Sequence, residues 1–392
     1  MKLKIRNKNS YIKHVIRFFV IFTLIVAYII GYIHKDKPVL SELQNFFPKK
    51  TTFQKISYAP LILKVNNNKN NSFSDYIVIE KAQGWGGPLH AATVIDAQGI
   101  IKQVIIIDHK ETPSYFVKIL RHRFFEKFKG KKVSESFILG YDIDTVSKAT
   151  ISSEAFTKAI RVGSHTIGEK IFNLKIKEKK PQWKFGTDEI ILLIIYALIL
   201  IGALMKIKIL RYVTLAAGFV FLGFYLNSSI SIGNISSIFF GYFPSIKENT
   251  FWWLLIPGIF LITFISRKNL YFSWLCPFGA LQEFTAKIGG INIRLSKKVI
   301  KYAGYLSYLF TWIALMIIFL TSNPALGTYE PFATLFGLEG MGIQWFILPV
   351  VILGSFVLPR FWCRFFCPVR VMMELTINAR RGLDKILKGI KQ

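Results

Sequence analysis

Apolar runs long enough to cross a bilayer recur along the chain and set its expected architecture. The run at 18–33 is uncharged and follows a basic start, which is typical of an uncleaved membrane anchor. A signal peptide has the same order, but no small-x-small cleavage site follows the run. Further apolar runs follow Glu189, so about six spans are expected, at 18–33, 190–205, 212–227, 251–265, 303–320 and 342–358.

Between the first two spans the pattern changes to that of a soluble domain, with charges of both signs and short alternating apolar stretches. Residues 90–109 predict two strands joined by a turn at 96–99, and residues 153–172 predict a helix. The fold class is therefore an α+β domain joined to an α-helical membrane bundle. The expected parts are a cytoplasmic start and anchor at 1–34, the α+β domain at 35–187, the membrane domain at 188–375 and a basic tail at 376–392.

The charge pattern gives the expected topology. Of the 392 residues 52% are hydrophobic, yet the formal net charge is +29. Alternate connections hold 24 Lys and Arg against three Asp and Glu, namely 1–17, 206–211, 267–301 and 360–392. The positive-inside rule then places both termini in the cytoplasm and the α+β domain outside, so the charge does not indicate nucleic-acid binding. The uncharged but polar segment 227–246 is interfacial or re-entrant, and the sequence leaves both open.

Histidines and cysteines limit the redox chemistry of the membrane half. All six His precede residue 166, which excludes His-ligated haem among the later spans. The three Cys are late and clustered, so they do not indicate a disulfide framework. Cys363 and Cys367 form Cys-x-x-x-Cys-Pro, and Cys276 precedes another Pro. These three are candidate metal ligands, or else buried or redox-active thiols without metal.

Hydroxyl residues precede the helix predicted at 153–172, in the sequence Asp-Thr-Val-Ser-Lys-Ala-Thr-Ile-Ser-Ser from residue 144. Hydroxyls and backbone N–H groups at a helix start suit a phosphate, although an ordinary helix cap has the same composition. Upstream, the glycine cluster 84–88 and the segment 111–114 are either turns or places where backbone approaches a ligand.

In this order, the segments from 84 to 153 resemble the FMN-binding domain of the RnfG/NqrC subunits and the NosR/NirI family. The resemblance implies that a flavin transferase esterifies the phosphate of FMN to Thr150, the last residue of a D-x-x-[S/T]-G-A-T pattern. Lys148 stands where the family has Gly, and its charge would be placed to assist the phosphate. The resemblance gives these expected FMN-binding residues: Thr150, Asp144, Ser147, Ala149, Ser153, Gly86, Gly87, Glu111 and Thr112.

The thiols also resemble a family feature, two cytoplasmic Cys-x-x-x-Cys-Pro motifs in the NosR/NirI membrane domain. Phe272 occupies the place of the first Cys, so a four-thiolate iron–sulfur cluster would need another ligand or a partner.

The resemblance implies a multi-pass protein of the bacterial cytoplasmic (inner) membrane that carries electrons and is no stand-alone enzyme. Electrons would pass from quinol or a cytoplasmic ferredoxin-like donor, through FMN, to an extracytoplasmic reductase. No catalytic residue is expected. A redox-sensing regulator or a maturation factor for a reductase is the alternative. A component of an ion pump ranks third, because the spans lack carboxylates for an ion pathway.

Overall fold

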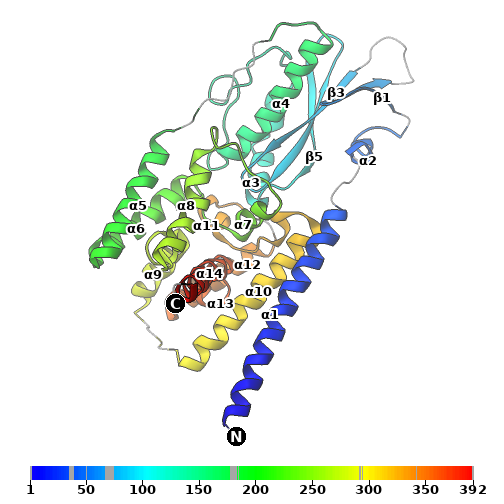
Figure 1. Cartoon of the computed structure of the whole chain (residues 1–392). Helices are drawn as coiled ribbons and strands as arrows, with labels where there is room; N and C mark the ends of the chain where they lie inside the picture. The colour runs from blue at the N-terminus through cyan, green and yellow to red at the C-terminus, as the bar shows by residue number, and fades with distance from the viewer. Residues whose placement is uncertain are drawn as a thin grey trace.

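The computed structural model describes residues 2–34, 39–49, 51–66, 75–176, 183, 185–290, 293, 295–340 and 342–390. A domain of one sheet and several helices lies on top of a larger helical part (Figure 1). This arrangement confirms an α+β domain joined to a helical remainder. Residue 35, where we expected the α+β domain to begin, lies outside the described residues.

One antiparallel sheet of five strands forms the centre of the upper domain, with the strands side by side in chain order. The strands are β1 Thr52–Tyr58, β2 Leu61–Asn66, β3 Asp75–Gln83, β4 Pro88–Ile95 and β5 Ile101–His109. The hairpin predicted at 90–109 is confirmed, because β4 and β5 pair antiparallel. At its turn Gly99 has a φ of +79°, a left-handed conformation that favours glycine.

Helix α4, Thr150–Lys170, covers one face of this sheet by packing on β3 and β4. The close approach depends on Gly163, where an added Cβ would lie 3.0 Å from Val78 Cγ1. The predicted helix is confirmed, but it begins at Thr150 rather than at Ser153. Thr150 is therefore part of the first helical turn. The domain also contains α2 Val39–Gln44, α3 Pro113–Arg121 and the 3-10 helix η1 Phe124–Phe128.

Every apolar run expected to span the membrane is helical. These helices are α1 Lys2–Ile33, α5 Thr187–Met205, α6 Lys208–Gly218 with its π-helical continuation η2 Phe219–Tyr225, α8 Thr250–Ser266, α10 Lys297–Thr321 and α12 Gln344–Val357. Among the described residues, four segments are long and apolar enough to cross a membrane, namely His14–Ile33, Thr187–Met205, Lys208–Tyr225 and Lys298–Thr321. Helices α8 and α12 are apolar but shorter. Membrane location is thus supported, while six crossings remain a prediction.

Shorter helices fill the space between these segments. They are α7 Ile232–Phe239, η3 Tyr271–Leu275, α9 Pro277–Gly289, η4 Pro324–Gly327, α11 Phe332–Gly337, α13 Phe361–Phe365 and α14 Pro368–Ile390. The polar segment 227–246 contains α7, which lies beneath the sheet domain (Figure 1). Helix α14 runs unbroken past residue 375, where we expected the membrane domain to end.

Helices α1 and α10 lie side by side over much of their length (Figure 1). The indole N–H of Trp312 donates a hydrogen bond of 3.1 Å to Thr23 Oγ1. Further along, Gly31 touches the α10 backbone so closely that an added Cβ would lie 1.8 Å from the Phe319 carbonyl oxygen. The sequence therefore fixes this crossing with a glycine, as helix pairs in membranes often do.

The substitution Gly31→Ala should lower the free energy of unfolding by about 1–3 kcal/mol, because the new methyl group forces the two helices apart. Gly304→Ala on α10 is the matched control, since no atom lies within 4 Å of its added Cβ. Thermal unfolding of the detergent-solubilised protein measures both. Equal midpoints for the two variants would contradict the close approach.

Candidate functional site

The glycine turn at Gly84–Pro88 is held by a buried carboxylate. Glu111 Oε1 accepts hydrogen bonds from the backbone N–H of Gly86 at 2.8 Å and of Thr112 at 3.0 Å, and Oε2 accepts from Trp85 N–H at 3.0 Å. Burial raises the pKa of Glu111, and these N–H donors favour its charged form. The structure thus brings together four expected site residues, Gly86, Gly87, Glu111 and Thr112.

The glycines of this turn are required by its packing on the chain at 110–112. An added Cβ would lie 2.1 Å from Glu111 Oε2 at Gly84, 2.8 Å from Thr112 N at Gly86 and 2.7 Å from Lys110 Cβ at Gly87. Real Cβ atoms do not approach this closely, so the turn could not close on Glu111 with side chains there.

The loop before α4 leaves the start of that helix open. Ala149 occupies the N-cap and has no side-chain acceptor, and no acidic residue lies in the first turn. Within the described residues, no N-cap side chain therefore bonds the first N–H groups of α4, and such groups suit an anion. Thr150, the first residue of α4, is exposed. Lys148 has a φ of +62°, the left-handed region that explains why a glycine is favoured at this place.

The other expected residues of the loop occupy different surroundings. Asp144 and Ser147 are exposed, and Asp144 lies 3.5 Å from the ammonium of Lys127. Ala149 is buried. Ser153 is also buried, and its hydroxyl donates a hydrogen bond of 2.9 Å to the Ala149 carbonyl. Ser153 therefore stabilises the first turn of α4 from inside.

Thr150 lines a cavity of about 460 Å³ between the sheet domain and the helical part. Arg161 and Lys158 of α4 contribute positive charge to its wall, and Glu248 before α8 pairs with Lys158 at 2.5 Å. This volume lies in the range of small-molecule sites. Glu154 lines the cavity as well, so acids accompany both cations of its wall. The Thr150 hydroxyl at a helix start suits a phosphate-bearing ligand such as FMN.

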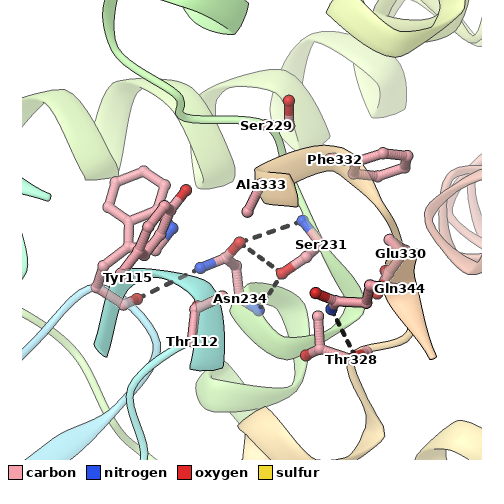
Figure 2. Close-up of a pocket in the computed structure, with 11 residues that line it drawn as sticks. Thr112, Tyr115, Ser229, Ser231, Asn234, Thr328, Glu330, Phe332, Ala333 and Gln344 are labelled. Atoms are coloured by element: carbon pink, nitrogen blue, oxygen red, sulfur yellow. Dashed lines mark hydrogen bonds between the residues drawn. The ribbon is translucent and has the colours of Figure 1, made fainter. Parts of the chain in front are cut away.

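A second cavity, of about 10 Å³, lies between the two parts of the molecule. Figure 2 shows Asn234 of α7 at its centre, beside Ser231 and facing Thr112 and Tyr115 of the sheet domain. Asn234 Nδ2 donates to the Trp85 carbonyl at 3.3 Å, and the Tyr115 hydroxyl donates to the Asn227 carbonyl. A space of this size suits one water molecule.

Glu330 lines this second cavity and is 2% exposed. Its Oε1 accepts a hydrogen bond of 2.7 Å from Ile232 N–H at the start of α7. Its Oε2 has no hydrogen bond within the part of the chain that the structure describes. Burial raises the pKa of Glu330 to about 7. We did not expect Glu330, Asn234 or Tyr115 at a site, although the unusual Ser, Asn and Gly content of 227–246 was a signal.

The three candidate thiols are buried and free. Cys276 and Cys367 directly precede the prolines that begin α9 and α14, and Cys363 lies in α13. All three interact with one another electrostatically, so the fold brings them together. Gln282 Nε2 also donates to Cys363 Sγ at 3.3 Å. Burial raises the pKa of all three thiols, and the positive ends of α9 and α14 partly oppose this effect at Cys276 and Cys367.

The thiols fit an iron–sulfur cluster in part. Among the described residues, no group of three or more His, Cys, Asp or Glu side chains is arranged to hold a metal ion. Phe272, at the place of the fourth Cys, is buried in the π-helical turn η3. The three thiols therefore remain candidate ligands that are not arranged around one metal in the described structure, and a cluster would need its fourth ligand from another group.

Comparisons with known proteins agree with this division of the chain. The FMN-binding domain matches residues 84–163, and the 4Fe-4S binding domain matches residues 249–296 and 341–386. Protein NirI of Paracoccus denitrificans is 30% identical over an alignment of 203 residues that covers 45% of this chain and 29% of NirI. Regulatory protein NosR of Pseudomonas aeruginosa is 26% identical over an alignment of 188 residues that covers 44% of this chain and 26% of NosR. The chain therefore resembles the NosR/NirI family of membrane flavoproteins.

A further relative of this NosR/NirI-like chain is one component of the proton-translocating ferredoxin:NAD(+) oxidoreductase complex of Clostridium ljungdahlii. It is 25% identical over 136 residues, which are 32% of this chain and 74% of that component. The chain spans less than a third of the length of NirI and of NosR. An FMN-binding domain, a 4Fe-4S binding domain and membrane helices in one chain support a role in membrane electron transfer.

Glu330 should make stability depend on pH. It stays protonated in the folded protein up to a pH of about 7, whereas the ordinary value is 4.5. The folded state therefore binds a proton that the unfolded chain releases, and stability should fall as pH rises between these values, by about 3 kcal/mol in all. Unfolding of wild type and Glu330→Gln at pH 5 and pH 8 measures the difference. Parallel pH dependences would contradict it.

Proposed function

We propose that this chain carries electrons across a bacterial inner membrane through FMN bound covalently to Thr150. The observation that carries the proposal is the position of Thr150, at the uncapped start of α4 and on the wall of a cavity of about 460 Å³. A phosphoester there would place the phosphate beside free helical N–H groups. The reaction needs a flavin transferase as a separate partner.

The chain's own residues would hold FMN as follows. The N–H groups of the first α4 turn would bind phosphate oxygens, with Arg161 adding charge from the same cavity. Glu111 would keep the Gly84–Pro88 turn closed behind α4, since Ser152 of the first α4 turn lies beside it. When bound, FMN supplies one-electron and two-electron chemistry.

For the topology we propose six crossings, with both termini in the cytoplasm and the domain at 35–187 outside. Contacts between the connections support this arrangement. Glu283 pairs with Arg211 at 2.7 Å and with Arg360 at 2.8 Å, and Arg267 pairs with Asp384 at 3.0 Å. These ion pairs join the basic connections to one another.

The remaining connections, which this topology places outside, contact the domain that contains the sheet, called the flavin domain from here on. Glu248 pairs with Lys158, Asn234 bonds to the Trp85 carbonyl, and Glu339 pairs with Arg121 at 2.6 Å. The two sets of connections thus contact different partners, which supports the topology that we propose from the positive-inside rule.

We propose that electrons enter from quinol or a cytoplasmic ferredoxin-like donor, pass the thiols and reach FMN and then an extracytoplasmic reductase. A series of contacts between the thiols and the flavin domain supports a route between them. Tyr271, which interacts with Cys276, accepts a hydrogen bond of 3.2 Å from Ile230 N–H. Asn234, on the helix that follows, bonds to the Trp85 carbonyl.

A redox-sensing regulator is the second candidate function, and a maturation factor for a reductase belongs with it. The name of its relative NosR, a regulatory protein, favours this reading. A regulator needs the same flavin but no sustained electron flow.

Replacing Thr150 by Val should abolish covalent flavin, because Val has similar shape but no hydroxyl to esterify. The protein is expressed with a flavin transferase, and in-gel flavin fluorescence is measured after denaturation. Thr145→Val is the matched control, since Thr145 lines the same cavity and should keep its fluorescence. Fluorescence that survives in Thr150→Val would overturn the attachment site.

Cys363→Ser should abolish reduction of the flavin from the cytoplasmic side, because a hydroxyl is a poor ligand for iron and a poor redox centre. Dithionite added on the flavin side should still reduce the variant, and protein levels are compared in parallel. Unchanged reduction from the cytoplasmic side would exclude a relay through the thiols and favour the regulator.

A further inference from the structure

The side chain of Lys148 extends from the flavin domain and contacts the helical part. Its ammonium donates a hydrogen bond of 3.0 Å to the Phe336 carbonyl and lies 5.8 Å from the centre of the Phe224 ring. Lys148 stands two residues before Thr150, so this contact joins the flavin-attachment loop to residues almost two hundred positions further along the chain.

The accepting carbonyl belongs to the last turn of α11. Helix α11 ends at Gly337, and Leu338 after it has a left-handed backbone. Carbonyls of a last turn lack partners within the helix, and the helix dipole favours a cation beside them. An ammonium is therefore a suitable partner for Phe336 O, and the bond is charge-assisted.

The contact also extends to a membrane helix. The Phe336 ring packs edge-on against Phe219 and Phe224, with ring centres 5.8 and 5.2 Å apart. Both partners belong to η2, the end of the apolar segment Lys208–Tyr225. Lys148 thus connects the Thr150 loop, through one carbonyl and one aromatic cluster, to a candidate membrane span.

The backbone conformation at Lys148 is unfavourable, which suggests that the contact of its side chain with Phe336 has a role. A φ of +62° is unfavourable for any residue with a Cβ, and glycine would relieve it. Glycine would also remove the only atoms that reach Phe336 from this position. Strain of this kind persists where the surrounding contacts stabilise it, often at functional sites.

We propose that Lys148 is a positioning residue that docks the flavin-attachment loop on the membrane domain and fixes the distance between flavin and electron donor. The role of Lys148 in electron transfer rests on the proposed function. The docking of the loop by Lys148 concerns the protein with or without flavin, so the docking and the proposed function can fail separately.

The first experiment measures hydrogen–deuterium exchange of the loop at 141–150 in the full-length protein in detergent, without flavin. Lys148→Met removes the ammonium and keeps the length and the strained backbone. Lys127→Met is the matched control, because Lys127 also contacts this loop, at the Asp144 carbonyl, but stays within the flavin domain. Loop exchange should increase in Lys148→Met, and Lys148→Arg should restore protection.

The second experiment measures reduction of the attached flavin in proteoliposomes. Menadiol in the bilayer is the membrane-side reductant, and dithionite in solution reaches the flavin directly. Lys148→Met should slow reduction by menadiol by about tenfold or more, since small misplacements of reacting groups carry penalties of this size. Reduction by dithionite should be unchanged. Lys148→Gly should bind flavin at least as completely as wild type and show the same slow menadiol reaction.

Unchanged exchange in Lys148→Met, or an equal increase in Lys127→Met, would overturn the docking contact. Increased exchange with an unchanged menadiol rate would overturn its role in electron transfer. Wild-type protein without covalent flavin would refute the proposed function alone, and the exchange experiment would still decide whether Lys148 docks the loop.

Discussion

The arrangement depends on one constraint: hydrogen bonds between buried polar groups join the flavin domain to the helical part across their boundary. A buried group without a hydrogen bond costs about 1–3 kcal/mol, so the contacts fix how the two parts fit together. Asn234 bonds to the Trp85 carbonyl, Tyr115 to the Asn227 carbonyl and Lys110 to the Tyr242 hydroxyl at 2.8 Å. Each pair joins one group of the flavin domain to one group of the helical part. A polar boundary of this kind defines one orientation, whereas an apolar boundary would allow sliding.

The same constraint explains the glycine turn and its acid. Glu111 is buried, and the backbone N–H groups of the turn satisfy its oxygens at close range. The turn can make that approach only with glycine at Gly84 and Gly86. Trp85 within the turn then presents its carbonyl to Asn234. A local motif of the flavin domain thus also forms part of the boundary with the membrane domain.

The sequence predicted the elements with strong local signals. The hairpin of β4 and β5, helix α4 and the apolar helices all follow from periodicity and turn residues, which act over a few positions. Thr150 was expected just ahead of a helix, and it is the first residue of that helix. Glu330 and the contact of Lys148 were not foreseen. Their partners, Ile232 and Phe336, are distant in sequence, and no local pattern encodes a contact of that range.

Departures from local rules lie along the connection between the thiols and Thr150. Lys148 has a left-handed backbone, Glu330 has a buried oxygen without a hydrogen bond in the described structure, and Phe272 stands where the resembled motif has Cys. A fold selected for stability alone would avoid such features, and proteins tolerate them mainly where function requires it. Glu330 interacts with Cys367 electrostatically and lines the cavity shared with Thr112 of the flavin domain. The boundary between the flavin domain and the helical part therefore holds groups whose surroundings are among the least relaxed in the described structure.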